Sequence, residues 1–395
     1  MNQVLFNFND VILLMTAMQC FLFAVLLLAT NTSKSPSTYF LAAFLLAHAF
    51  IPLHELMLWG AEFKLTVREF YPNLLFIGGS AYYLDGALLY FCVKSLVFRD
   101  FRLHRSDAVH LVPLILFLLF MYVAFYSLPA AERLELIHTD KFVYGSGYVF
   151  VEFLGKCLRV GYVLLCLQLI IKYKGLLKAT HSNIEKVDLT WLNLLVIGFL
   201  SVMSTEIVLS VSKLVSLFQH YELIVFEYIG LTGYYSLFFL VNLLVFTGIR
   251  YFANFEAVKQ KESTKRPLNE RLLNPDCAEQ IDRAMRTDKP YLMPDITLDI
   301  LAGKLAIPAK DLSMVINRHF GSHFYEFVNG YRIEEATRIL SSPEGKDKTI
   351  TDIYLDVGFN SKSVFNTFFK KIVGMTPSQY RQNQPLAKAA TGLQT

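Results

Sequence analysis

Several ionisable side chains interrupt long apolar stretches in the first 249 residues, and six of them are our candidates for a ligand pocket. In chain order they are Glu55, Asp85, Glu152, Lys156, Arg159 and Glu206. A charged group inside a membrane-spanning segment is costly and usually faces the interior of a helix bundle. Glu152, Lys156 and Arg159 are spaced so that they share one face of a helix. We interpret the six as the lining of a polar ligand pocket. The alternative is a structural ion pair together with side chains that extend toward the helix ends.

The stretches that carry these charges are long enough to cross a membrane. Of the 395 residues, 54% are hydrophobic and 18% are charged, whereas a soluble domain has about a quarter charged residues. A helix needs roughly 20 apolar residues to span a bilayer. We expect about seven spans, with six or eight as alternatives, at 10–30, 38–59, 72–94, 108–128, 148–171, 189–211 and 225–249. This pattern predicts a polytopic helical membrane bundle over residues 1–249.

The distribution of Lys and Arg predicts the orientation of the bundle. If the N-terminus lies outside, the short inner loops carry nine Lys or Arg and the outer loops carry five. Basic residues concentrate in cytoplasmic loops. We therefore expect residues 250–395 to be cytoplasmic.

Motifs for catalysis or metal binding are missing from the sequence. The five cysteines include no Cys-x-x-Cys pair and no Cys/His ligand spacing, so we expect no metal site and no disulfide framework. There is also no Gly-rich phosphate loop and no nucleophile elbow. We therefore expect no catalytic residues, no cofactor and no enzymatic activity.

The remainder of the chain reads as a linker and an all-α domain. Residues 250–275 are polar and contain Pro267 and Pro275. Apolar residues at helical spacing then predict helices at 276–288, 297–306, 309–320, 323–341, 349–357, 361–373 and 377–383. The expected domains are thus 1–249, 250–275, 276–382 and a tail, 383–395.

This all-α domain contains an internal repeat. Leu298, Leu301, Ala302 and Leu305 recur 52 residues later as Ile350, Ile353, Tyr354 and Val357. Each unit is a short helix, a tight turn and a second helix, which is the outline of a helix-turn-helix. The turns fall at 306–308 and 358–361, where Gly358 permits a positive φ and Ser361 suits an N-cap.

Residues 349–381, TITDIYLDVGFNSKSVFNTFFKKIVGMTPSQYR, resemble the second helix-turn-helix of the AraC/XylS family of bacterial transcription regulators. The matching residues include Gly358, Phe359, Ser361, Phe365, Lys370, Lys371, Gly374, Pro377 and Tyr380. Residues 321–340 resemble the linker helix of that family, and 301–321 match its first unit more loosely. Tyr354 departs from the family, which usually has a small residue there.

The resemblance implies a DNA-binding face. A recognition helix lies in the major groove with its N-terminal residues at the base edges. By analogy, the base-contact candidates are Lys310, Ser313, Met314, Lys362, Ser363, Asn366 and Thr367. The phosphate-contact candidates, which position the protein without reading sequence, are Arg318, Arg332, Lys370, Lys371 and Arg381. Taken singly, each of these cations could equally belong to a solvated face.

Together these features predict a membrane-embedded one-component transcription regulator of the bacterial inner membrane. It would sense a ligand or a membrane signal and bind promoter DNA. The alternatives are a membrane transporter or enzyme with an autoregulatory DNA-binding tail, and a plain membrane anchor for the DNA reader. The expected partners are double-stranded promoter DNA, membrane lipids, a small-molecule effector, RNA polymerase and a second copy of the chain.

Overall fold

A computed structural model describes residues 6–30, 35–98, 101–184, 190–218, 223–251, 275–345 and 347–383. Its regular elements are helices, with no strand among the described residues. The chain divides into two compact units. The first consists of residues 1–171 and 188–260, and the second of residues 172–187 and 261–395. Residues 172–187, which we expected within the membrane part, therefore group with the C-terminal part.

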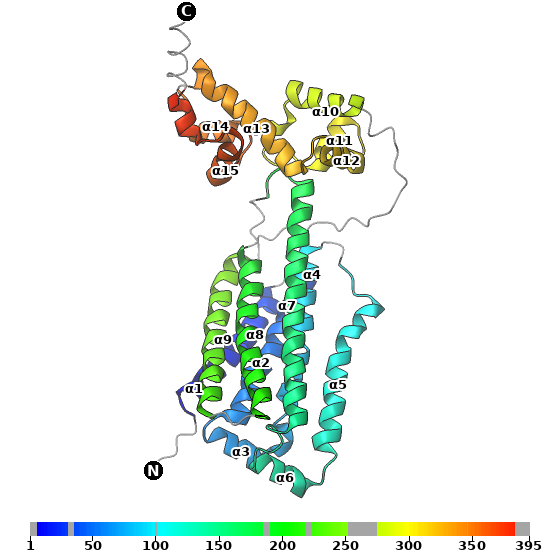
Figure 1. The fold of residues 1–395 in the computed structure, drawn as a ribbon, viewed down its shortest axis with the longest axis vertical. Helices are drawn as coiled ribbons and strands as arrows, with labels where there is room; N and C mark the ends of the chain where they lie inside the picture. The colour runs from blue at the N-terminus through cyan, green and yellow to red at the C-terminus, as the bar shows by residue number, and fades with distance from the viewer. Residues whose placement is uncertain are drawn as a thin grey trace, which may run out of the picture. The chain divides into compact units, whose positions relative to one another are not determined.

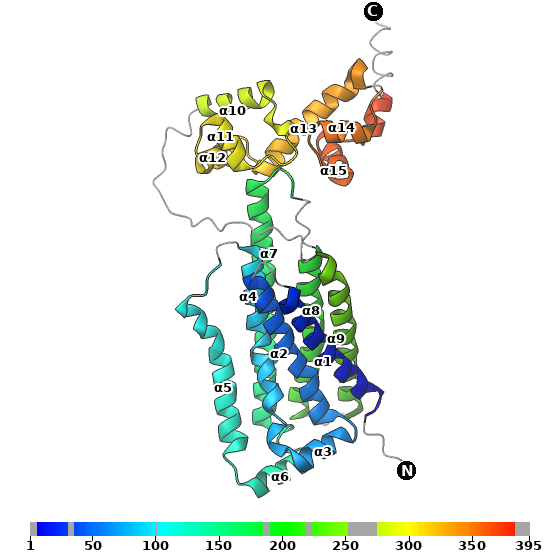
Figure 2. The same ribbon diagram turned by 180° about the vertical axis from the view of Figure 1, so that it is seen from behind.

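The first unit is a bundle of long helices (Figure 1). These are α1 (Phe8–Thr30), α2 (Pro36–Trp59), α4 (Asp85–Val97), α5 (Val112–Met121), α7 (Ser146–Thr180), α8 (Thr190–Ser216) and α9 (Leu223–Tyr251). Helix α1 packs against α2 and α9, α2 against α4, and α8 against α9. The short helices α3 (Phe63–Phe70) and α6 (Ala130–His138) cross the end of the bundle at which α2 ends (Figure 2).

Six segments of the described residues are long and apolar enough to cross a membrane. They are Phe8–Ala29, Pro36–Trp59, Pro72–Val97, Arg105–Tyr126, Ser146–Thr180 and Leu192–Ser216. The seventh expected stretch lies in α9, whose apolar section is Tyr228–Leu244. On α5, Ile115, Leu116 and Leu119 are each more than half exposed, and such a surface suits lipid better than water.

The third of these segments is not one continuous α-helix. It consists of 3-10 turns at η1 (Pro72–Leu74) and η2 (Ile77–Tyr83), followed by α4. Gly78 lies so close to α2 that a Cβ atom there would be 2.8 Å from His54 Cβ. Of the two tyrosines at the end of η2, Tyr82 donates a hydrogen bond to Glu55 on α2 and Tyr83 donates one to the Val151 carbonyl on α7.

The second unit contains the expected helices, each within one or two residues of its expected bounds. They are α10 (Pro275–Thr287), α11 (Leu298–Leu305), α12 (Ala309–His319), α13 (Phe324–Ser341), α14 (Ile350–Asp356), α15 (Lys362–Val373) and residues 377–383. They form two hydrophobic cores. Leu301, Leu312 and Ile316 are buried in the first, and Phe365 and Phe369 in the second. Helix α13 joins the two helix-turn-helix units, because its first half packs in one core and its second half in the other.

The repeat is visible in the backbone as well as in the sequence. Thr297 and Thr349, which are 52 residues apart, both cap their helices by accepting a backbone N–H three residues later. Ala306 and Gly358 both have positive φ, 53° and 92°. A Cβ at Gly358 would also lie 2.8 Å from the Tyr291 carbonyl oxygen, so glycine is required there for two reasons.

Two further residues of the second unit bear on the resemblance. Ser361 caps α15 as expected, by accepting the backbone N–H of Val364. Tyr354 takes the place that Ala302 has in the first unit. It is only partly buried, and its ring centroid lies 6.0 Å from that of Phe365, so the second core accommodates it at its edge.

We expect residues 270–395 expressed alone to form a folded helical domain, because both cores lie between residues 277 and 380. In this fragment, Phe369→Ala should lower the free energy of unfolding by about 3–5 kcal/mol, as expected for a buried aromatic side chain. Urea denaturation followed by circular dichroism measures the loss. The exposed Lys371→Ala is the control, with a change of about 0.5 kcal/mol at most. If Phe369→Ala unfolds at the parent's midpoint, the face we assign to the core is wrong.

Candidate functional sites

A buried ion-pair network lies inside the first unit. Arg159 on α7 is 1% exposed and donates through Nε to both oxygens of Asp85 on α4, at 3.1 and 2.9 Å. The other side of its guanidinium contacts Glu206 on α8. His48 lies 3.3 Å from Asp85, and Lys156 lies 3.0 Å from Glu206. The network therefore joins α4, α7 and α8 through ion pairs and α2 through the contact of His48 with Asp85.

A cavity of about 420 Å³ lies next to this network. Four of the six candidate pocket residues line it, namely Glu55, Glu152, Lys156 and Glu206. Asp85 and Arg159 are not among its lining residues, because they are fully buried behind it. The structure thus places all six ionisable residues in one region of the bundle, four of them at the cavity.

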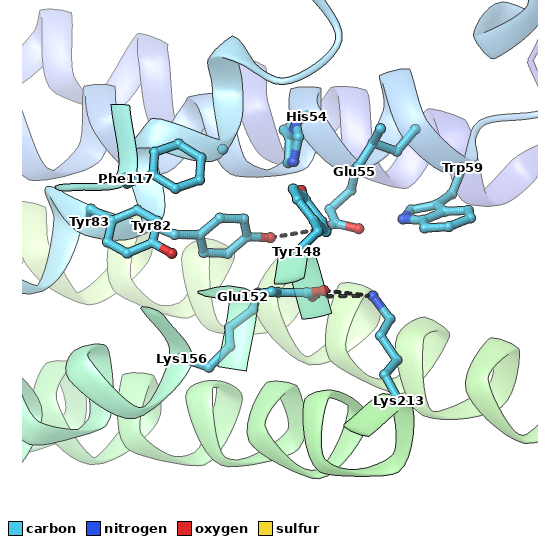
Figure 3. Close-up of a pocket in the computed structure, with 12 residues that line it drawn as sticks. His54, Glu55, Trp59, Tyr82, Tyr83, Phe117, Tyr148, Glu152, Lys156 and Lys213 are labelled. Carbon is cyan, nitrogen blue, oxygen red and sulfur yellow. Dashed lines mark hydrogen bonds and ion pairs between the residues drawn. The ribbon is translucent and has the colours of Figure 1, made fainter. Parts of the chain in front are cut away.

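The cavity also has lining residues that the sequence analysis did not select. Lys213 on α8 forms an ion pair with Glu152 at 3.2 Å, as Figure 3 shows. The same view shows Tyr82 directed at Glu55, to which it donates a hydrogen bond of 2.5 Å. Lys213 follows Glu206 by seven residues, and this helical spacing could have identified it. Tyr82 has no comparable signal, because its position depends on the 3-10 turn η2.

The cavity lies at one end of the bundle. Trp59 ends α2, Lys64 is in the first turn of α3, and Asp10 is in the first turn of α1. Asp10 accepts a backbone N–H from Ala61 at 3.0 Å, which ties α1 to the end of α2. Helix α4, which has Lys94 in its last turn, runs toward the opposite end of the bundle (Figure 1).

In the second unit, the candidate base-contact residues lie on α12 and α15. All seven of them are exposed or partly exposed: Lys310, Ser313, Met314, Lys362, Ser363, Asn366 and Thr367. Leu312, Ile316, Phe365 and Phe369 on the same helices are buried. Arg318, Lys370 and Lys371 are exposed near the C-terminal ends of the two helices. The two helices thus each have an apolar inner face and a polar or basic outer face.

Arg332 does not belong to this surface, so the interpretation of it as a phosphate contact is wrong. Its side chain is fully buried. Its guanidinium donates to the backbone carbonyls of Tyr291 at 2.7 Å, Met293 at 2.8 Å and Pro294 at 3.2 Å. Arg332 therefore holds the segment before α11 against α13. From the sequence, Arg332 is a basic residue on an amphipathic helix. Nothing in the local pattern predicts that the backbone carbonyls of Tyr291, Met293 and Pro294 accept hydrogen bonds from it.

Arg381 also differs from an ordinary phosphate contact. It lies on helical residues 377–383 and is only partly exposed. Its Nε and Nη2 atoms are buried and have no hydrogen-bond partner among the described residues. We therefore keep Arg318, Lys370 and Lys371 as the exposed phosphate-contact candidates.

Ion pairs and hydrogen bonds on the outer side of α13 strengthen its attachment to neighbouring segments. Hydrogen bonds from Arg338 and from Lys289 hold the pKa of Glu335 below its ordinary value. A hydrogen bond from Tyr331 likewise lowers the pKa of Asp282 on α10. A carboxylate with a lowered pKa stabilises the fold above its ordinary pKa and loses that contribution as the pH falls.

We expect Arg332→Ala to destabilise the 270–395 fragment by about 3 kcal/mol or more, because it leaves several buried carbonyl oxygens without donors. The exposed Arg318→Ala should change stability by only about 0.5 kcal/mol. Chemical denaturation of the two variants compares them directly. Equal stability of both variants and the parent would show that Arg332 is a surface residue after all.

Comparisons with known proteins agree with the architecture of the second unit. Residues 301–383 match the model of a helix-turn-helix domain family. An uncharacterized HTH-type transcriptional regulator of Staphylococcus aureus is 32% identical over 117 residues, which are 30% of this chain and 15% of that relative. The chain thus spans only a small part of the length of such relatives. No solved structure matches it.

A second relative is matched over most of its length. The probable transcription factor PqrA of Proteus vulgaris is 33% identical over 88 residues, which are 22% of this chain and 70% of that relative. The named relatives are transcription regulators rather than enzymes. Through its C-terminal domain, the chain belongs to the AraC-type family of helix-turn-helix transcription regulators.

Proposed function

We propose that the chain is a membrane-embedded one-component transcription regulator. In this proposal the first unit lies in the bacterial inner membrane and binds its signal in the 420 Å³ cavity. The second unit lies in the cytoplasm and binds duplex promoter DNA through α12 and α15. The observation that carries the proposal concerns α7, which contributes Glu152 and Lys156 to the cavity, while its last residues belong to the second unit.

The residues that follow α7 are bonded into the second unit. The backbone N–H of Ser182 donates to the Ile296 carbonyl at 3.2 Å. The Ser182 carbonyl accepts from Asn329 at 3.2 Å, and its hydroxyl accepts from Arg332 at 3.2 Å. Ser182 is 1% exposed. Because Asn329 and Arg332 lie on α13, these bonds join the segment that follows α7 to the helix between the two helix-turn-helix units.

This arrangement supports a direct route for the signal. A ligand that alters the charges on α7 changes the position or strain of that helix. The change then reaches α13 through Ser182, without a second protein. The similarity to transcription regulators supports the DNA-binding half of the proposal. The other partners that we expect are RNA polymerase, membrane lipids and a second copy of the chain. Neither the transporter nor the plain anchor is favoured by a specific contact in the described residues.

The DNA-binding half predicts different effects for two residues of α15. Asn366→Ala should cost about 1–3 kcal/mol on a site selected from a random duplex library and should relax preference at one base pair. Lys370→Ala should weaken selected and random duplexes alike and reduce the salt slope by about one unit. Fluorescence anisotropy titrations at several salt concentrations measure both. An unchanged ratio of specific to random binding in Asn366→Ala would show that α15 does not read bases.

The proposed sensing function predicts that charged side chains at the cavity control transcription by the DNA-binding second unit. Promoters occupied by the protein are first mapped across the genome, and one is fused to a reporter gene. Replacing Glu152 and Lys213 together by Gln removes an ion pair at the cavity, so we expect reporter output to change at least roughly fivefold, a typical coupling magnitude. DNA affinity of the solubilised protein and its level in the membrane should stay the same.

The matched control for that variant is Glu135 and Lys141 replaced by Gln. These residues form an exposed ion pair at 3.2 Å outside the cavity, and the control should keep the parent's reporter output. If both double variants behave like the parent, the first unit is an anchor rather than a sensor.

A further inference from the structure

The cavity of the first unit contains one more acidic than basic side chain. Its charged lining consists of the four acids Asp10, Glu55, Glu152 and Glu206 and the three lysines Lys64, Lys156 and Lys213. An uncompensated charge in apolar surroundings is costly. The residue that carries the extra negative charge therefore indicates which class of ligand the cavity binds.

Ion pairs compensate two of the four acids. Glu152 lies 3.2 Å from the Lys213 ammonium group. Glu206 contacts Lys156 at 3.0 Å and also Arg159. These groups are satisfied before any ligand enters.

Asp10 has a structural role at the start of α1. Its Oδ2 atom accepts the backbone N–H groups of Asn7 and Ala61, both at 3.0 Å. Lys64 lines the same cavity and carries the opposite charge. Asp10 therefore caps a helix, and both backbone donors are in place before any ligand enters.

Glu55 is different from the other three acids. The hydroxyl of Tyr82 donates to Oε1 at 2.5 Å, and the hydroxyl of Tyr234 donates to Oε2 at 2.9 Å. Both oxygens act as acceptors, which is the pattern of an ionised carboxylate. Within the part of the chain that the structure describes, Glu55 makes no ion pair. Two neutral phenols thus orient its charge, while Lys156 and Lys213 act on it from beyond ion-pair distance and are themselves paired with Glu206 and Glu152.

The walls around Glu55 are aromatic and apolar. Trp59, Tyr82, Tyr144 and Tyr234 contribute rings, whose faces attract cations. The protein already uses this attraction, because the Lys156 ammonium lies 3.5 Å from the centroid of Tyr82 and that of Lys213 lies 5.6 Å from Trp59. Leu13, Ile51, Pro52, Leu209, Ile229, Leu231 and Leu237 add an apolar surface, and the uncharged polar residues Asn7, Asn9 and Thr205 also line the cavity.

We propose that this cavity binds an amphiphilic organic cation, with an amine or quaternary ammonium group paired with Glu55. The apolar part of the molecule lies against Leu13, Ile51 and Leu237. A volume of about 420 Å³ suits a small molecule of this kind. The inference rests on the proposed function, since it names the chemical class of the signal. The ammonium group has two sources, a free organic cation or the headgroup of a membrane lipid.

The test uses the full chain with Trp191→Phe, which leaves Trp59 as the single tryptophan. The protein is placed in nanodiscs of phosphatidylglycerol, a lipid without an ammonium group. Benzyltrimethylammonium is titrated while Trp59 fluorescence is recorded, and its neutral isostere neopentylbenzene is titrated in parallel. We expect a saturable change with the cation, and binding of the neutral isostere at least roughly tenfold weaker, a difference of about 1.4 kcal/mol.

Two variants assign this difference to Glu55. Glu55→Gln should weaken cation binding at least roughly tenfold, whereas Glu55→Asp, which retains the charge, should restore part of it. Glu132→Gln, which changes an exposed carboxylate of α6, is the matched control and should bind like the parent. Equal binding of cation and isostere, or an unchanged affinity in Glu55→Gln, overturns the proposal. So does preferential binding of phenylacetate that is lost in Lys213→Gln, and so does the absence of any saturable response.

A second nanodisc preparation distinguishes the two sources of the ammonium group. If phosphatidylethanolamine in the disc competes with benzyltrimethylammonium, the lipid headgroup occupies the cavity; without competition, a free cation does. Both results support the proposal. The reporter assay separates the inference from the function on which it rests. If the protein binds the cation but the reporter does not respond to the Glu152 and Lys213 change, the proposed ligand class stands and the proposed sensing function is wrong. If the reporter responds but the protein does not bind the cation, the sensing function stands and only the ligand class is wrong.

Discussion

A guanidinium group that is 1% exposed must find its counter-charges inside the helix bundle, and Arg159 does so on two sides at once. Asp85 on α4 and Glu206 on α8 are held to α7 by the same side chain. Removing one partner of a buried ion pair typically costs about 3–5 kcal/mol, because the other charge remains uncompensated. The register of these three helices, and with it the shape of the adjacent cavity, depends on this one arrangement of charges.

The same constraint separates the ionisable residues of the first unit into two kinds. Asp85 and Arg159 fit the interpretation of a structural ion pair, because they are buried away from the cavity. Glu55 lines the cavity and accepts hydrogen bonds from two tyrosine hydroxyls, and it is the residue to which we assign the ligand in our proposal. In our proposal, the two interpretations that are alternatives at the level of sequence apply to different residues of one cluster.

Local patterns predicted the second unit better than they predicted its long-range contacts. The helix bounds, the matched turns at Ala306 and Gly358 and the Ser361 cap follow from residue type and spacing. By contrast, the contacts of Arg332 depend on carbonyl groups about 40 residues earlier in the chain. Glu55 and Tyr234 are 179 residues apart, and their contact exists only because α2 and α9 lie in the same bundle. No periodicity within one segment carries such information.

The second unit is assembled from two stretches of chain, with α8 and α9 between them in sequence. During synthesis, Ser182 leaves the ribosome before α8 and α9, and its partners Asn329 and Arg332 leave after them. A protease that cut between α9 and α10 would release a domain that lacks Ser182. In the proposed function, proteolytic release of the DNA-binding domain therefore removes the connection through Ser182 by which the signal reaches it. If the proposed function holds, the chromosome must instead come to the membrane, so the location of the target promoter within the nucleoid becomes part of its regulation.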